Sequence, residues 1–204
     1  MWNGSSGTTA EGNTFIDCQR EIAFGLIDRT PNNHTGGVIR NNIIYRPPSV
    51  AGDAAIGMFD SPSTQVLHNT ILGSGTYLSL IECRFPQSAG VQIANNLLDR
   101  GILARDGASG TLSGSVTTAA PALFVNPSVG DLHLAPTATS LVDRVAVLAN
   151  AATDWDGQSR PRGAAADAGA DEYVPSAPPS TPKNLGIVPV ERLTPRGPSS
   201  FPVC

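Results

Sequence analysis

A regular spacing of asparagine residues is the feature that most constrains how this chain can fold. Asn42, Asn69 and Asn96 follow one another at intervals of 27 residues. Each lies in a short apolar stretch of similar design, residues 39–45 in the first of them, and a looser copy precedes them at residues 13–17. Internal repeats with periods of roughly 20–50 residues indicate solenoids, propellers or arrays, in which neighbouring repeats bury one continuous core.

Superposing the three good copies gives two apolar columns, one on each side of the asparagine. One column contains Ile39, Val66 and Ile93, and the other contains Ile44, Ile71 and Leu98. Side chains alternate between the faces of a strand, so positions five residues apart face one interior only if the chain bends between them. Asparagine tolerates the left-handed conformation that a sharp bend requires. We therefore predict two short strands joined by an asparagine bend in every repeat.

The asparagine side chains are themselves expected to stack. In strands that pair in constant register, each amide can form a hydrogen bond with the same residue in the layers above and below. Asn42, Asn69 and Asn96 would then form a buried structural ladder, and they would not contribute to a binding site.

A third apolar segment completes each repeat, at residues 22–27, 55–59, 77–81 and 101–104. Three short strands per repeat predict an all-β fold, a parallel β-helix of about four coils that stack at about 4.8 Å. Residues 111–116 alternate like a final strand. A leucine-rich repeat is the alternative with a similar period, but the repeats contain neither a Leu-x-x-Leu-x-Leu frame nor a helical stretch.

Composition narrows the functional classes. Charged residues make up 15% of the chain, and its 21 glycines and 17 prolines are typical of a turn-rich β protein. The formal net charge of −4 provides no basic face for nucleic acid. No apolar run approaches the roughly 18 residues of a membrane span, and the first residues lack the charged and apolar regions of a signal peptide. We expect a monomer.

Pattern and composition divide the chain into four parts. Residues 1–11 form an N-terminal loop or the cut edge of a coil, residues 12–120 the coils, residues 121–173 a C-terminal cap, and residues 174–204 a Pro-rich disordered tail or linker. A solenoid needs about three repeats for stability and a cap at its ends. Because an exposed strand edge invites aggregation, we expect the cap to cover the last coil.

The C-terminal part carries a recognisable motif. Its matching positions are Asp131, Leu132, Asp154, Asp156, Gly157, Arg160, Pro161, Asp167, Gly169, Ala170, Glu172 and Tyr173. This pattern resembles the end of exported bacterial right-handed parallel β-helix repeat proteins of the choice-of-anchor Q type, although residues 140–143 lack the proline of that pattern. The resemblance implies a right-handed, pectate-lyase-like solenoid, an extracellular or cell-surface location, and a polysaccharide as the partner class.

Within this resemblance, several motif residues are expected to form a structural clasp that closes the cap. The clasp residues are Asp154, Asp156, Arg160, Asp167 and Tyr173. Asp156 begins a turn with the following glycine. Arg160 is expected to pair with Asp167 or Asp171, while Trp155 and Tyr173 cover the open edge of the last coil.

The same turn permits an alternative as a Ca²⁺ site, because Asp154 and Asp156 are spaced like the first ligands of a calcium-binding loop. An EF-hand loop requires further oxygen ligands and a glutamate twelve residues from its start, which the sequence lacks. The clasp is therefore the preferred interpretation, and Ca²⁺ is the cofactor that remains open.

Catalytic candidates come from charged residues near the third strands. A β-helix lyase requires a base, usually lysine or arginine, beside a uronate, and the coils contain no lysine. Arg84 with Glu82, and Arg105 with Asp106, are the candidates for catalysis or sugar contact. The alternative is that they form solvated ion pairs of small energetic worth. The Asn-Thr-Asp, Asp-Asp and Gly-His-Gly motifs of polygalacturonase-type hydrolases do not occur.

The histidines provide no obvious general base. His68 occupies an asparagine column, so we expect a ladder or surface residue, because no neighbouring group in the sequence would orient it. His34 lies in a polar loop and His133 in a strand, and neither has a partner that is visible in the sequence.

Three cysteines at irregular spacing form neither a disulfide framework nor a metal motif. Cys18 and Cys83 follow or lie within apolar strand segments, and we expect both thiols to be buried. Cys204 ends the Pro-rich tail, where we expect it to be exposed.

Taken together, the sequence favours a non-catalytic structural or carbohydrate-interaction segment of an exported bacterial β-helix protein. The alternative is the C-terminal part of a polysaccharide lyase or glycoside hydrolase with an incomplete active site. An adhesin stalk is a third possibility. The identity of the glycan does not follow from these residues.

Overall fold

The computed structural model describes residues 4–28, 31, 33–49 and 51–175. The Pro-rich tail that the sequence predicts lies outside the described residues from residue 176 onward, and so does Cys204. The described part is an all-β protein, in which helix is limited to the short 3₁₀ turns η1 (Pro121–Leu123), η2 (Pro127–Val129) and η3 (Ala149–Ala151).

Three parallel sheets lie side by side and share their chain order. Sheet 1 contains β2 (Thr9–Glu11), β6 (Val38–Arg40), β9 (Gln65–Leu67), β12 (Val91–Ala94) and β15 (Gly110–Ser113). Sheet 2 contains β3 (Thr14–Ile16), β7 (Ile43–Tyr45), β10 (Thr70–Leu72) and β13 (Leu97–Leu98). Sheet 3 contains β4 (Ile22–Gly25), β8 (Ala54–Phe59), β11 (Ser79–Arg84) and β14 (Ile102–Arg105). The chain passes through sheets 1, 2 and 3 in turn and then returns to sheet 1, and we call one such passage a circuit.

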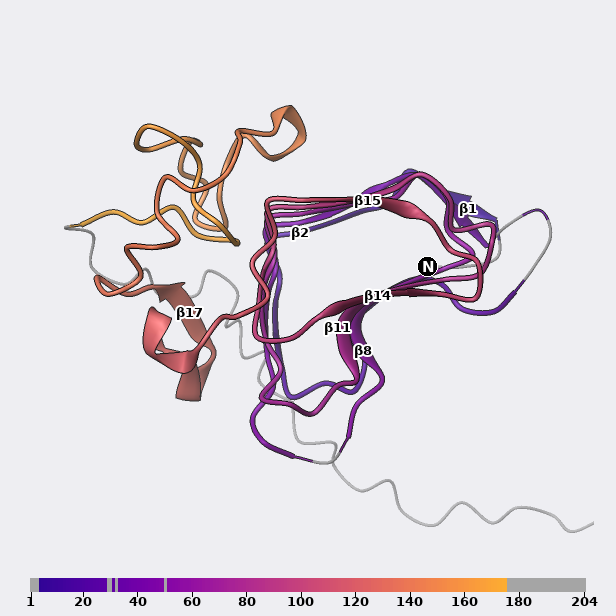
Figure 1. Ribbon diagram of the computed structural model, residues 1–204, viewed down its shortest axis with the longest axis horizontal. Helices are drawn as coiled ribbons and strands as arrows, with labels where there is room; N and C mark the ends of the chain where they lie inside the picture. Colours follow the sequence, from indigo (N-terminus) through magenta and orange to yellow (C-terminus); the bar gives the residue numbers. More distant parts are fainter. Residues whose placement is uncertain (1–3, 29–30, 32, 50, 176–204) are drawn as a thin grey trace, which may run out of the picture.

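Figure 1 looks along the stack, so that the successive circuits overlie one another. A short parallel pair, β1 (Ser5–Ser6) with β5 (His34–Thr35), adds to the N-terminal side. Because β1 and β2 pair with β5 and β6, these strands agree with the edge of a coil, the second of the two expectations for residues 1–11, and not with a loop.

The register of the strands confirms the 27-residue repeat. Val66 pairs with both Ile39 and Ile93 in sheet 1. In sheet 2, Ile71 pairs in the same way with the apolar residues one repeat before and after it. Both apolar columns lie in one hydrophobic core together with residues of sheet 3, such as Ile56. The expected bend between the columns therefore exists.

Each bend is made by the residue before the ladder asparagine. Asn41, His68 and Asn95 have φ angles of 52°, 50° and 59°, and Gly12 and Gly114 continue the same column with 65° and 60°. This left-handed conformation reverses the side-chain alternation, so the strands on both sides can face the interior. Asparagine and glycine are the residues that reach this conformation at least cost.

The buried asparagine ladder is also confirmed. Nδ2 of Asn42 donates to Oδ1 of Asn69 at 2.9 Å, and Nδ2 of Asn69 donates to Oδ1 of Asn96 at 2.9 Å. The same oxygens accept the backbone N–H of the preceding ladder residue. Asn13 begins the ladder, and the Ser115 hydroxyl accepts the backbone N–H of Asn96 at its other end. The sequence did not indicate the role of Ser115.

The third strands lie where the sequence predicts them, within one to three residues. The largest shift is in β11, which begins at Ser79 and therefore excludes Tyr77. Tyr77 is instead 1% exposed in an outer loop, where its hydroxyl donates to Oε1 of Glu21 at 2.5 Å and Arg46 lies over its ring at 5.0 Å. The turn insertion that follows Arg46 is thus attached to the stack by a buried polar contact.

The two cysteines in the described residues differ in burial. Cys83 faces the interior core and is buried, as predicted, and burial raises the pKa of its thiol to about 12. Cys18 is only partly buried, so the prediction of a buried thiol is wrong there. It follows β3 at the edge of sheet 2, where no further strand in the described residues covers it.

Residues 121–175, which we call the C-terminal segment, pack against the side of the stack. An antiparallel pair, β16 (Phe124–Asn126) with β17 (Asp131–Leu134), is its only sheet in the described part of the chain. A second hydrophobic core joins Leu132 and Ala168 of this segment to the outer side chains Ile43, Leu72 and Leu97 of sheet 2. In Figure 1 the segment (orange) lies beside the outline of the circuits.

The prediction that residues 121–173 cover the open edge of the last coil is therefore wrong. β15 is the last strand of sheet 1, and all four of its residues are exposed, with Leu112 at 62%. The outer side chains of sheet 2 are apolar in successive circuits, and this apolar column attracts the segment to the side of the stack.

The bend residues hold the C-terminal segment in place. Nδ2 of Asn41 donates to the carbonyl of Thr153 at 2.7 Å, Nδ1 of His68 lies 3.1 Å from the carbonyl oxygen of Gly169, and Nδ2 of Asn95 donates to the carbonyl of Ala146 at 2.8 Å. We call Asn41, His68 and Asn95 the docking column. Three successive circuits thus each provide one side chain that contacts the backbone of the segment.

Candidate functional site

The four side chains that the sequence singles out for catalysis or sugar contact lie together outside sheet 3. Glu82 and Arg84 belong to β11, and Cys83 between them faces the interior core. Side chains alternate along a strand, so Glu82 and Arg84 point outward. β14 pairs with β11 in a register that makes Arg84 and Arg105 direct neighbours. Asp106 follows at a left-handed bend, with a φ of 53°.

The ion pairs of this cluster cross between the strands. Nε of Arg84 lies 2.5 Å from Oδ2 of Asp106, and Nη2 of Arg105 lies 2.8 Å from Oε1 of Glu82. The expected pairing of Arg84 with Glu82 is wrong, and the expected pairing of Arg105 with Asp106 is a longer contact of 3.6 Å. In this register Glu82 lies opposite Leu103, so Glu82 and Arg105 are diagonal neighbours, a separation that long side chains can bridge.

Burial differs sharply within the cluster. The side chain of Glu82 is 4% exposed, while those of Arg84, Arg105 and Asp106 are 37%, 38% and 44% exposed. A buried carboxylate requires a hydrogen-bonded cation, and Arg105 provides it through both Nε and Nη2. Glu82 therefore anchors Arg105 from below, and the two guanidinium groups form the accessible part of the cluster.

Two aromatic rings lie beside arginines on this face: Phe59 lies beside Arg20, and Phe85 lies beside Arg84. The ring of Phe59 lies over Gly57, where a Cβ atom would be 2.3 Å from it. Arg20 lies 5.2 Å from the centroid of Phe59, and Arg84 lies 4.7 Å from that of Phe85, so both arginines make cation–π contacts. These rings were not recognised from the sequence as part of the site. Gly57 and Phe59 are two residues apart on a strand next to the arginines, and this spacing could have indicated a ring that lies over the glycine.

This arrangement suits binding better than proton transfer. Half-exposed guanidinium groups can donate hydrogen bonds to hydroxyl or carboxylate groups of a ligand. A guanidinium remains protonated in proteins, and the Glu82 and Asp106 carboxylates already accept hydrogen bonds from arginine. A general base must lie within hydrogen-bond reach of the proton that it removes and be free to accept it. The histidines of the described residues lie elsewhere in the molecule.

His68 is part of the interface with the C-terminal segment. It is fully buried, and burial lowers its pKa to about 3. The neutral imidazole donates from Nδ1 to the carbonyl of Gly169, and its Nε2 accepts from Nδ2 of Asn95 at 2.9 Å. Of the two expected roles, a ladder position or the surface, the surface role is excluded.

His34 is likewise buried, and it lies in β5 and not in the polar loop that the sequence indicates. Its ring nitrogens lie 3.1 Å from the Ser61 hydroxyl and 3.0 Å from the Thr8 hydroxyl. Ser88 continues the series, because its hydroxyl accepts the backbone N–H of Ser61. These residues form a second internal polar ladder with the same period of about one circuit. Burial lowers the pKa of His34.

The clasp exists, but its partners differ from those expected. Arg160 pairs with Glu172 and not with Asp167 or Asp171, with Nη1 2.9 Å from Oε1. Asp167 instead accepts the backbone N–H of Asp143 and of Tyr173. Glu172 is buried beside Arg160 because it follows the tight Gly169 turn that packs on the stack, and its Oε2 accepts a further N–H from Arg162.

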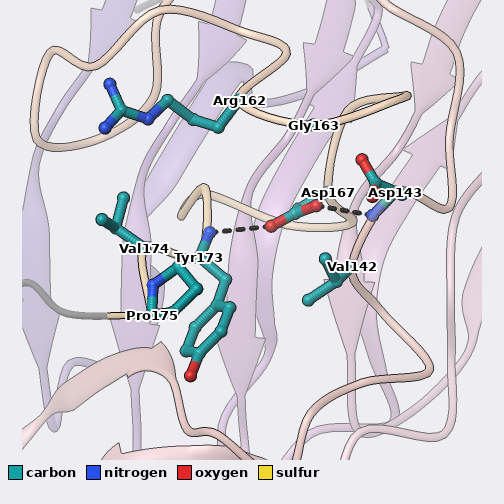
Figure 2. A pocket seen from close by; sticks show the side chains of 8 residues that line it. All are labelled: Val142, Asp143, Arg162, Gly163, Asp167, Tyr173, Val174 and Pro175. Carbon is teal, nitrogen blue, oxygen red and sulfur yellow. Dashed lines mark hydrogen bonds between the residues drawn. The ribbon is translucent and has the colours of Figure 1, made fainter.

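A cavity of about 300 Å³ lies beside this clasp. Figure 2 shows it between Val142, Asp143, Arg162, Gly163, Asp167, Tyr173, Val174 and Pro175. Its carboxylates are occupied by backbone amides: Asp167 accepts the two bonds drawn in Figure 2, and Oδ1 of Asp143 accepts the N–H of Ala165. These carboxylates thus hold the backbone of the C-terminal segment, which indicates a structural role for them.

The two aspartates considered for Ca²⁺ point to different partners. Asp154 is buried, and its two oxygens accept the backbone N–H of Gln158 and of Glu172 at 2.6 and 3.1 Å. Asp156 lies against His133, with Oδ2 3.2 Å from Nε2. The fold thus gives His133 a carboxylate partner that is not visible in the sequence. Burial lowers the pKa of His133, but hydrogen bonds to Asp156 and Asp131 outweigh this effect and raise it to about 9.

Comparison with other proteins adds no further assignment. Within the described residues, no helix is both long and apolar enough to cross a membrane. No family model, no curated protein and no solved structure matches this chain.

Proposed function

We propose that this chain is a right-handed, pectate-lyase-like parallel β-helix of about four coils, of the choice-of-anchor Q type. Its function is that of a non-catalytic structural or carbohydrate-interaction segment. The parent protein would be an exported bacterial protein at the cell surface. Three parallel sheets visited in constant order, the 27-residue register and the buried asparagine ladder support the fold. The C-terminal motif and its buried Arg160–Glu172 pair support the relationship.

One observation carries the non-catalytic assignment. All four candidate catalytic side chains, Glu82, Arg84, Arg105 and Asp106, are engaged in ion pairs with one another. The buried carboxylate is under Arg105, and the exposed one is bound to Arg84. Proton abstraction would require one of these carboxylates to give up its arginine partner. The ion-paired arrangement therefore favours ligand binding over proton transfer.

The accessible guanidinium groups supply the binding chemistry. Arg84 and Arg105 are direct neighbours on paired strands, and Arg84 also covers the ring of Phe85. A planar fork of N–H donors beside an aromatic ring can recognise the hydroxyl or carboxylate groups of a sugar chain while the ring packs against its apolar face. A polysaccharide is therefore the partner class of this face.

Retention of the purified chain on a panel of immobilised neutral and acidic polysaccharides tests this proposal. We expect retention on at least one of them and a loss of retention in the Arg84→Ala, Arg105→Ala double variant. Arg144→Ala is the matched control, because Arg144 is exposed in the C-terminal segment away from the cluster. Equal retention of the double variant and the control would refute the carbohydrate role of this face.

The alternative function is a polysaccharide lyase or glycoside hydrolase, of which this chain would be the C-terminal part with an incomplete site. The juxtaposition of Arg84 and Arg105 favours it, because two guanidinium groups can neutralise the carboxylate of a uronate. Lyase action would release unsaturated uronates, which absorb in the ultraviolet. If such products appear on pectate, alginate or chondroitin and disappear with Arg84→Ala, the enzyme alternative replaces the proposal.

A further inference from the structure

A second group of polar side chains lies in the C-terminal segment and has no part in the proposed function. His133 lies on β17, Asp156 lies in the turn after Trp155, and Asp171 lies near the end of the described chain. One ligand atom from each of the three residues lies within 4.8 Å of the other two. His133 is 9% exposed and Asp171 is 5% exposed. Residues remote in sequence therefore converge in a sheltered place.

The imidazole of His133 is oriented in the way that metal-binding histidines are. Its Nδ1 lies 2.5 Å from Oδ1 of Asp131, and its Nε2 faces Oδ2 of Asp156 at 3.2 Å. Histidine ligands of metals almost always donate their second ring N–H to a carboxylate or carbonyl, which fixes the tautomer and the plane of the ring. Here Asp131 fixes the ring so that Nε2 points to Asp156.

The side chains of this group that belong to the described residues are mostly acidic. Three carboxylates, those of Asp131, Asp156 and Asp171, surround a single imidazole. The nearby guanidinium of Arg160 is already paired with Glu172. Buried carboxylates are stable only when they are paired or coordinate a metal. A divalent cation bound among these carboxylates would add to the charge that the imidazole and their other partners provide.

One pair of ligand atoms has the spacing of a small tetrahedral ion, and the three atoms, which lie within 4.8 Å of one another, would have to close around it. Zinc binds nitrogen and carboxylate oxygen at about 2.0–2.2 Å, which places adjacent ligands about 3.3 Å apart. The observed separation of 3.2 Å between His133 Nε2 and Asp156 Oδ2 agrees with this value. The presence of an imidazole favours zinc over calcium, which selects oxygen ligands.

Next to His133, on the side of Asp131, there is room for a water molecule. A cavity of about 40 Å³ is lined by Asp131, His133 and Trp155 together with apolar side chains, and a water molecule requires less than this. Nε1 of Trp155 is buried and has no hydrogen-bond partner among the described residues. A water molecule bound in this cavity would be an acceptor for that N–H.

We propose that His133, Asp156 and Asp171 form a binding site for a divalent transition-metal ion, with Zn²⁺ as its representative, a water molecule as the fourth ligand and Asp131 as the residue that positions the imidazole. The ion replaces the proton on Nε2, which is released to solvent. Bound there, it ties β17 to the Trp155 turn and to the end of the clasp. The site is structural and independent of the carbohydrate face.

Titration of the full chain, freed of metal with a chelator, tests this proposal. Isothermal calorimetry with ZnCl₂ should show one equivalent bound, and the melting midpoint should rise with Zn²⁺ concentration, because a ligand of the native state stabilises it. In a Trp2→Phe background, emission from Trp155, whose ring centroid is 5.3 Å from that of His133, should change with the same stoichiometry. Co²⁺ should give the visible absorption bands of a tetrahedral site.

Variants separate coordination from mere charge balance. Asp156→Asn and His133→Gln should weaken Zn²⁺ binding at least tenfold, and Asp131→Asn by about 10–100-fold, as for other carboxylates that orient a histidine ligand. Asp143→Asn in the same segment should bind like the unchanged chain. The Co²⁺ spectrum of the unchanged chain decides the question if a variant does not fold. No heat and no midpoint shift at millimolar Zn²⁺, equal binding by His133→Gln, or Ca²⁺ binding as tight as Zn²⁺ would each overturn the proposal.

Discussion

Arg160 and Glu172 form an ion pair in the C-terminal segment, with Nη1 and Oε1 2.9 Å apart and no exposed surface on either side chain. Nη2 of the same arginine donates to Oδ1 of Asn41 and to the carbonyls of Gly169 and Ala170. The pair thus joins the clasp to the docking column. A buried ion pair of this kind matters most when one partner is removed, because the other then remains charged without compensation.

Arg160→Leu should lower the free energy of unfolding by about 3–5 kcal/mol, because Glu172 would remain buried without its cation. Arg144→Leu, an exposed arginine of the same segment, is the control and should change it by less than about 0.5 kcal/mol. Urea denaturation followed by circular dichroism measures both. The double variant Arg160→Leu, Glu172→Leu should recover part of the loss. An Arg160→Leu protein as stable as the control would contradict the assigned role.

Asn69→Ala should destabilise the stack more than Asn13→Ala. Asn69 is fully buried, and its removal leaves the backbone N–H and the amide of Asn42 without their acceptor. Each buried group without a partner costs about 1–3 kcal/mol. Asn13 lies at the partly exposed end of the ladder, where water can replace it. Chemical denaturation of the two variants in parallel gives the difference, and equal losses would show that the ladder does not depend on burial.

His68 should make the protein sensitive to acid. Its pKa is about 3 in the folded state and about 6.5 when unfolded, so below pH 6.5 the unfolded chain binds a proton that the folded chain does not. Stability from this residue is therefore lost as the pH falls from 6.5 towards 3, at up to about 1.4 kcal/mol per pH unit.

His68→Asn is the informative variant, because asparagine occupies the equivalent bend position at Asn41 and Asn95 with the same left-handed conformation. Melting midpoints between pH 4 and 7 should show a shallower dependence on pH in His68→Asn than in the unchanged chain. Identical slopes would mean that the imidazole is accessible to protons in the folded state.

Glu21 should act in the opposite direction. Burial raises its pKa to about 7 and outweighs the hydrogen bond from Tyr77, which lowers it. Between about pH 4.5 and 7 the folded state therefore keeps a proton that the unfolded state has lost, and stability decreases as the pH rises through this window. Glu21→Gln should remove this decrease and raise the melting midpoint above pH 7. Melting curves at pH 5 and pH 7.5 test it, and a variant with the original slope would disprove the raised pKa.

The architecture could be predicted from the sequence because equivalent positions of successive repeats carry similar residues. Ile39, Val66 and Ile93 occupy one register position, and a one-residue slip would turn them to the outer face. Local conformational preference acts in the same direction, since asparagine and glycine stand where φ is positive. The ladder follows from these two facts, and the third strands follow from the additional apolar segment of each repeat.

The position of the C-terminal segment could not be predicted in the same way. Ile43, Leu72 and Leu97 alternate with interior residues, so they read as part of the same apolar strands and not as an outer contact surface. Arg160 pairs with Glu172, which is adjacent in sequence to the expected Asp171. The partner of Arg84 was mistaken because a residue near in sequence was preferred to Asp106 on the next circuit. In a stack, the nearest charged group is commonly one circuit away.

The docking column has a consequence for how the length of the protein can change. Three backbone carbonyls of one continuous segment, at Ala146, Thr153 and Gly169, each meet a side chain from a different circuit. The C-terminal segment thus contacts three successive circuits, and the spacing of these contacts matches the spacing of the circuits. Duplication or loss of a circuit between Asn41 and Asn95 would separate the docking column from its backbone partners. Circuits added beyond β15 would leave these three contacts in place. Growth of such a protein is therefore easiest at its ends.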